Sequence, residues 1–65
     1  MSNVKRAVAI GLIYHGHGKK LWNTSHNLHK ALFNGSDKQF IDAVTEFYKG
    51  NSRSTRHKNF WNKFV

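Results

Sequence analysis

The sequence predicts an all-α fold of four helices in a single basic domain, residues 1–65. Three observations support this prediction. Apolar residues recur at helical spacing, glycines and polar capping residues separate the apolar runs, and the 65 residues contain no proline. A chain of this length forms one small core, which buries only about 60% of the surface that the unfolded chain exposes. Nine aromatic residues make such a core feasible although the sequence has no cysteine for a disulfide.

The first helix is expected from about Val4 to Tyr14. Its apolar residues cover most of the circumference, which is typical of a buried central helix. A buried β-strand is the alternative for such a run, and Gly11 weakens the helix by about 1 kcal/mol. The segment from His15 to Gly18 should end the helix, because glycine readily adopts the left-handed conformation found at helix C-termini.

The second helix is expected from His26 to Phe33. Ser25 precedes it as a candidate N-cap, and Asn34-Gly35 follows as a stop signal. The loops of the fold should therefore include residues 15–24 and 34–36.

The third helix has the clearest local pattern of the chain. Ser36 and Gln39 are spaced as a capping box, in which each side chain accepts a hydrogen bond from the backbone N–H of the other residue. The helix should run to about Tyr48 and end at Lys49-Gly50. Its apolar stripe consists of Phe40, Ile41, Val44, Phe47 and Tyr48.

The fourth helix follows a polar loop near residues 49–54, with Ser54 or Thr55 as its cap. Its polar face carries Arg56, His57, Lys58 and Lys63, and its apolar face carries Phe60, Trp61, Phe64 and Val65. The sequence ends without a segment to cover these four side chains. We therefore expect a homodimer or a protein partner that contacts Phe60, Trp61 and Phe64.

The charge balance indicates an anionic partner. Eleven Lys and Arg residues stand against three acidic residues, which gives a formal charge of +8. Such a field favours nucleic acid, an anionic cell-wall polymer, an acidic protein or lipid headgroups. The alternative is that the charge only keeps a small protein in solution.

Basic residues interleaved with aromatic ones are the candidate binding site. Lys and Arg can pair with phosphate or carboxylate groups while an aromatic ring stacks on a base or a sugar. The candidate binding residues are Lys19, Lys20, Trp22, Phe47, Tyr48, Lys49, Arg53, Arg56 and Lys58. A core position is the favoured alternative for Phe47, whereas for Trp22 the core and a binding role are equally plausible.

The acidic residues indicate that the chain is not an enzyme. Asp37 stands at a helix start, and Asp42 and Glu46 share the polar face of the third helix. A carboxylate pair at this spacing could be that of a retaining glycosidase, but a solvated helix face is the stronger interpretation. No catalytic residue is therefore assigned.

The histidines predict no metal site, and no cofactor is expected. His15 and His17, and His26 with His29, each provide only two potential ligands, with no third placed beside them. No Gly-rich phosphate loop follows a strand either.

Several weak features follow one another in a characteristic order and at near-family spacing. They are Ala7–Ile10 leading to Gly16 or Gly18, Trp22–Ser25, Leu28 with Leu32–Gly35, Phe47, and Asn51–Arg56. In this order the chain resembles the C-terminal helical lobe of phage-type lysozymes, muramidases that cut bacterial peptidoglycan. The resemblance implies a small four-helix orthogonal bundle. The family's N-terminal lobe, with its catalytic Glu, Asp and Thr, has no counterpart in these residues.

The resemblance implies a non-catalytic phage module that binds peptidoglycan or a protein that completes the lobe. The alternative that uses the same charge is a small phage-like regulator. Such a regulator would bind either nucleic acid or a host enzyme that acts on nucleic acid. A lytic or antimicrobial peptide is a third interpretation, which the capping box and polar loops disfavour. The apolar run Ala7–Tyr14 is too short to span a membrane, so we expect a cytoplasmic protein that is released, if at all, on lysis.

Overall fold

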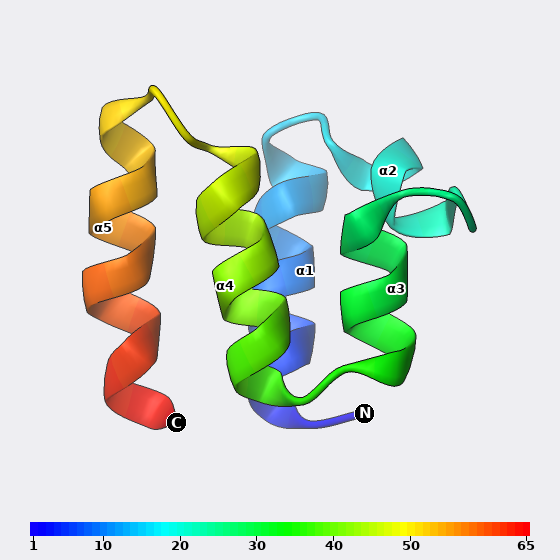
Figure 1. The fold of residues 1–65 in the computed structure, drawn as a ribbon, viewed down its shortest axis with the longest axis horizontal. Helices are drawn as coiled ribbons and strands as arrows, with labels where there is room; N and C mark the ends of the chain where they lie inside the picture. Colours follow the sequence, from blue (N-terminus) through cyan, green and yellow to red (C-terminus); the bar gives the residue numbers. More distant parts are fainter.

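The computed structural model of the chain describes residues 1–65 and is entirely helical, which confirms the predicted all-α class (Figure 1). It contains five α-helices followed by a short 3-10 helix, so the prediction of four helices missed one. The elements are α1 (Asn3–Tyr14), α2 (Gly18–Trp22), α3 (Asn27–Asn34), α4 (Asp37–Phe47), α5 (Ser52–Trp61) and η1 (Asn62–Phe64). The missed helix, α2, lies in the segment expected to be a loop.

Helix α4 occupies the centre of the molecule and packs against α1, α3 and α5. In Figure 1, α3, α4 and α5 run alongside one another, with α1 behind α4. Both termini lie at one end of the molecule, and the α1–α2 and α4–α5 connections lie at the other (Figure 1).

The core is built mainly from α4. Phe40 and Ile41 have no exposed surface, and the whole predicted stripe of α4 lies in the core or packs against it. The nine core residues are Val8, Leu12, Leu21, Leu28, Leu32, Phe40, Ile41, Val44 and Tyr48. Helix α5 contributes none of them and adds only the partly buried Trp61.

Helix α1 is not the buried central helix that its composition predicted. It packs against α2 and α4, and only Val8 and Leu12 are buried. Ile10, Ile13 and Tyr14 are 66%, 53% and 85% exposed, respectively. Helix α1 therefore has two apolar faces. The fold buries one of them and leaves the other exposed.

The capping box of α4 is confirmed. The backbone N–H of Gln39 donates to Ser36 Oγ (3.2 Å), and the backbone N–H of Ser36 donates to Gln39 Oε1 (2.7 Å). The left-handed turns expected after α1 and α4 are also present, at Gly16 (φ +86°) and Gly50 (φ +87°). Gly16 lies in the α1–α2 connection and Gly50 in the α4–α5 connection, and Figure 1 shows these two connections at one end of the molecule.

Two other caps differ from the prediction. His26, rather than Ser25, caps α3, because its Nδ1 accepts from the backbone N–H of Leu28 (3.0 Å). Helix α5 begins at Ser52 with Asn51 as its cap, so neither Ser54 nor Thr55 has that role. The Ser54 hydroxyl instead donates to the carbonyl of Thr45 (2.8 Å) and ties α5 to α4.

The C-terminal aromatic residues form a surface cluster that is half covered. Trp61 packs against the core, whereas Phe60, Phe64 and Val65 are 51%, 55% and 51% exposed. The rings of Phe60, Trp61 and Phe64 lie within 5.7 Å of one another. None of the helices combines the length and the apolar character needed to cross a membrane.

Candidate anion-binding site

A group of basic and aromatic side chains lies around the connections that follow α1 and α4. Figure 1 shows these two connections at the same end of the molecule. We call this group the basic–aromatic end and define it as His17, Lys20, Phe47, Tyr48 and Arg53. The ring of His17 lies 4.9 Å from that of Phe47 and 5.9 Å from that of Tyr48, measured between centroids. The structure thus joins the segment around α2 to the end of α4.

Two cations lie over the aromatic rings of this end. Lys20 Nζ is 5.5 Å from the Phe47 centroid, and the guanidinium carbon of Arg53 is 5.7 Å from the Tyr48 centroid. These are cation–π distances, so the rings hold the two charges in place. Tyr48 is only 8% exposed and Phe47 is half-buried. The end therefore presents charges to solvent rather than open ring faces.

The electrostatic field at this end is positive. Partial burial, followed by the nearby charges of Lys20, His15 and Arg53, lowers the pKa of His17 below its ordinary value of 6.5. His17 is therefore neutral at pH 7. A bound anion would offset the neighbouring charges of Lys20 and Arg53 and favour the protonated imidazole of His17.

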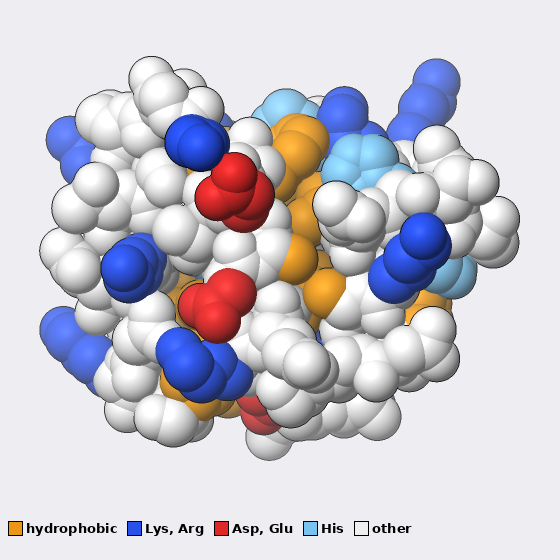
Figure 2. All heavy atoms as spheres, in the orientation of Figure 1, with side chains coloured by type: hydrophobic (Ala, Val, Ile, Leu, Met, Phe, Trp, Pro, Cys, Tyr) orange, Lys and Arg blue, Asp and Glu red, His pale blue; other side chains and the backbone are white.

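Few of the protein's cations are neutralised by acids. The two ion pairs are Lys38–Asp42 and Lys49–Glu46, each at 3.6 Å, so nine of the eleven Lys and Arg side chains have no carboxylate partner. Figure 2 shows Lys and Arg side chains spread over the visible face, with the acidic side chains gathered over α4. Lys20 and Arg53 are among the nine.

The predicted binding residues do not all converge. Lys19 is exposed on α2 beside Lys20, and Lys49 follows Tyr48. Trp22 is 71% exposed, and its ring lies 6.2 Å from that of Phe33, away from Phe47.

Two further predicted residues lie on α5, outside the basic–aromatic end. Arg56 lines a groove between α1 and α5, which Tyr48 and Arg53 of the basic–aromatic end also line. Lys58 lines a separate polar hollow together with Lys38 and Lys63. The predicted set is therefore divided among several surfaces.

The sequence did not predict that two histidines contact the ring of Phe47. His17 and His26 approach the Phe47 ring at 4.9 and 6.0 Å, whereas the sequence suggested only pairs of potential metal ligands. No three His, Asp or Glu side chains converge closely enough to hold a metal ion. The one available signal was the position of His17 directly before the basic segment that contains Lys19 and Lys20, which forms α2.

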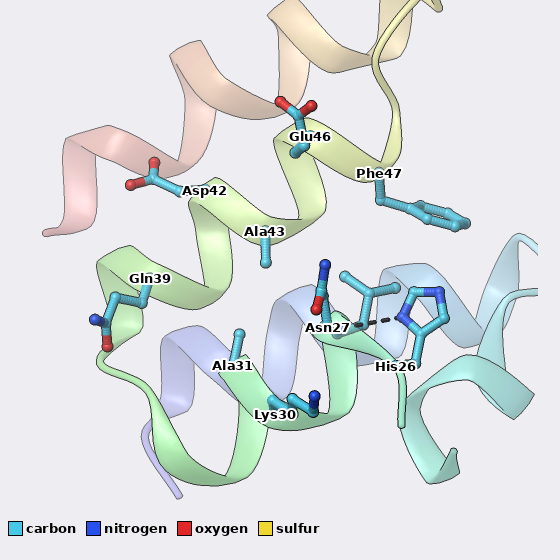
Figure 3. A pocket seen from close by; sticks show the side chains of 10 residues that line it. His26, Asn27, Lys30, Ala31, Gln39, Asp42, Ala43, Glu46 and Phe47 are labelled. Atoms are coloured by element: carbon cyan, nitrogen blue, oxygen red, sulfur yellow. Dashed lines mark hydrogen bonds between the residues drawn. The ribbon is translucent and has the colours of Figure 1, made fainter. Parts of the chain in front are cut away.

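A second groove, of about 710 Å³, lies between α3 and α4 (Figure 3). Ala31 and Ala43 face one another across it, whereas the carboxylates of Asp42 and Glu46 project from α4 away from α3. Those two side chains are 53% and 74% exposed and are paired with lysines. They line the edge of an open groove and enclose no protected site for a proton transfer.

No protein-family model, no curated protein and no solved structure matches this chain.

Proposed function

We propose that this protein is a non-catalytic module that binds an anionic polymer through the basic–aromatic end. The observation that carries the proposal is the placement of Lys20 and Arg53 around His17 without a carboxylate partner. Phosphate or carboxylate groups of a ligand would supply the missing negative charge. Because Phe47 and Tyr48 fix the two cations, little side-chain entropy is lost when the ligand binds.

Nucleic acid is the polymer that this geometry favours. The ring of Tyr48 is buried and that of Phe47 lies under a lysine, so contact depends on charge more than on stacking. A nucleic acid offers one phosphate per nucleotide along each strand and binds cationic surfaces largely through the release of counterions. Exposed cations without carboxylate partners, such as Lys19 beside Lys20, can extend the contact with such a backbone beyond the basic–aromatic end.

Peptidoglycan is the second candidate, and the exposure of Trp22 supports it. A ring that is 71% exposed can stack on a sugar face while Lys19 and Lys20 pair with carboxylates of the polymer. The likeness of the sequence to a lysozyme lobe favours the same ligand. In this interpretation the protein would reach its ligand on lysis, whereas nucleic acid is available in the cytoplasm.

The proposal includes that the protein has no catalytic activity of its own. Asp37 accepts a hydrogen bond from the Ser2 hydroxyl (2.7 Å), and Asp42 and Glu46 are exposed and paired with lysines. None of the three carboxyls lies in a dry pocket of the kind that creates a general acid. We expect the purified protein to leave chloroform-treated Gram-negative cells intact, and clearing of those cells would contradict this part of the proposal.

Two binding assays on the same protein separate the candidates. Fluorescence anisotropy with a labelled DNA duplex measures nucleic-acid binding, and sedimentation with insoluble peptidoglycan measures binding to the cell wall. Replacement of Lys19 and Lys20 by Gln should weaken DNA binding strongly, whereas Trp22→Ala should have little effect on it. Peptidoglycan binding that depends on Trp22, without DNA binding, would favour the second candidate. Failure to bind either polymer would contradict the proposal.

A further inference from the structure

A groove of about 390 Å³ runs between α1 and α5, with α4 beneath it. Its floor contains the buried side chains of Val8, Leu12 and Val44. Phe60 and Trp61 form part of its α5 wall. Both helices pack on α4, and the groove remains open between them.

The α1 wall of the groove is low and apolar. Ala7 and Gly11 are one helical turn apart, and a Cβ atom added at Gly11 would meet no other atom within 4 Å. Ile10 and Tyr14, which are 66% and 85% exposed, share this face because the four residues have the spacing i, i+3, i+4 and i+7. This is the second apolar face of α1, and it continues the groove toward solvent.

The ionisable side chains that line the groove are mainly arginines and histidines, together with Tyr48. Arg53, Arg56, His15 and His57 line it, and no acidic residue does. The protein's three carboxylates are engaged elsewhere, Asp37 with Ser2, Asp42 with Lys38 and Glu46 with Lys49. The groove thus combines an apolar floor with positive charge that no group of the protein neutralises.

From this combination we infer that the groove binds an acidic amphipathic helix of another protein. The apolar face of such a helix would cover the floor together with Ile10, Tyr14 and Phe60, and its carboxylates would pair with Arg53 and Arg56. The low wall at Ala7 and Gly11 permits close approach of a helix. Helix α1, with 12 residues and a length of about 18 Å, is long enough to support three turns of the bound helix.

A second copy of this chain does not have the required chemistry. All three acidic residues lie on α4, and the apolar face of α4 is already buried in the core. Two copies would also bring formal charges of +8 together. The charges therefore favour an acidic partner over the homodimer expected from the aromatic residues alone.

The test uses the full chain and a designed probe. The probe is a fluorescein-labelled peptide of about 18 residues, roughly 27 Å long as a helix, with leucines at i, i+3, i+4 and i+7 and glutamates beside them. A version with lysine in place of glutamate and a scrambled version are the peptide controls. Fluorescence anisotropy should show binding of the acidic amphipathic peptide and at least about tenfold weaker binding of both controls.

Two pairs of variants locate the bound peptide. Gly11→Phe should fill the groove and weaken binding at least about tenfold, whereas Gly11→Ala should leave the groove open and retain it. Arg56→Glu should weaken binding to a similar extent, whereas Lys58→Glu, with the same change of charge outside the groove, should not. Circular dichroism on each variant checks that the helices are retained.

Three outcomes would overturn the inference. They are equal binding of the acidic and lysine peptides, undiminished binding by a folded Gly11→Phe variant, and a homodimer that Gly11→Phe dissociates. Arg53 belongs both to the groove and to the basic–aromatic end. Lys19 and Lys20 lie outside the groove, so replacing them by Gln separates the two claims: it should reduce the affinity for DNA and leave the affinity for the peptide unchanged.

Discussion

His57 ties α5 to α4 through a hydrogen bond and ring contacts. Its Nε2–H donates to the carbonyl of Ile41 on α4 (3.2 Å), and its ring lies between those of Tyr48 and Trp61. Burial lowers the pKa of His57 below its ordinary value of 6.5, and the bond to Ile41 opposes that shift only in part. The folded state therefore prefers the neutral imidazole.

This preference predicts a pH dependence of stability. A histidine with a lowered pKa in the folded state contributes its full stabilisation above the unfolded value of 6.5 and loses it as the pH falls through 6.5 toward the folded pKa. The free energy of unfolding should therefore fall from pH 7.5 to pH 5, with a slope of at most about 1.4 kcal/mol per pH unit from this residue. Urea unfolding of the wild type and of His57→Gln measures the difference. An equally steep dependence in the variant would contradict this role.

Lys5 predicts a second effect at the residue scale. Its Nζ donates to the carbonyl of Leu32 (2.7 Å) and to that of Gly35, so a cation from α1 closes the C-terminus of α3. Lys5→Met retains much of the side chain and removes these bonds, and should cost about 1–2 kcal/mol of unfolding free energy in urea. Lys30→Met, at an exposed lysine of α3, should cost less than about 0.5 kcal/mol. Equal costs would show that the Lys5 bonds are not stabilising.

At the scale of elements, the sequence correctly predicted the features that depend on interactions between residues close together in the chain. The capping box at Ser36, the left-handed turns at Gly16 and Gly50, and the stripe of α4 depend on near neighbours in the sequence. Helix α2 has five residues and no capping side chain, so neither periodicity nor a cap marked it. The start of α5 was misplaced because several residues from Asn51 to Thr55 are good caps, and only the packing against α4 selects one.

The capping box provides the prediction for α4. Ser36→Ala removes the acceptor of the Gln39 N–H and should lower the free energy of unfolding by about 1 kcal/mol. Chemical denaturation with unchanged m-value is the measurement. Ser52→Ala is the matched control, because Ser52 is the first residue of α5 and Asn51 provides the cap there, so its cost should be within about 0.5 kcal/mol of zero. If Ser36→Ala leaves the free energy of unfolding unchanged, water replaces the hydrogen bond of the cap without a loss of stability.

At the scale of the whole molecule, the sequence predicted which types of residue form the candidate site but not how those residues are arranged in space. The sequence showed basic residues beside aromatic ones, and this identified Lys20, Phe47 and Arg53 as candidates. Which cation lies over which ring depends on tertiary packing, since Lys20 and Phe47 lie on different helices. The same packing buried Tyr48 and left Trp22 exposed, a division that the sequence left open.

The central claim is that the basic–aromatic end binds an anionic polymer by charge. The most direct test is the salt dependence of DNA-duplex binding, measured by anisotropy between about 50 and 200 mM salt. Wild-type affinity should fall by orders of magnitude, and replacing Lys19 and Lys20 by Gln should reduce the slope of log K against log salt by about 1–2. Replacing Lys58 and Lys63 by Gln, in the polar hollow of α5 and η1, should reduce it less. An unchanged slope in the Lys19/Lys20 variant, or an equal reduction in both variants, would contradict the claim.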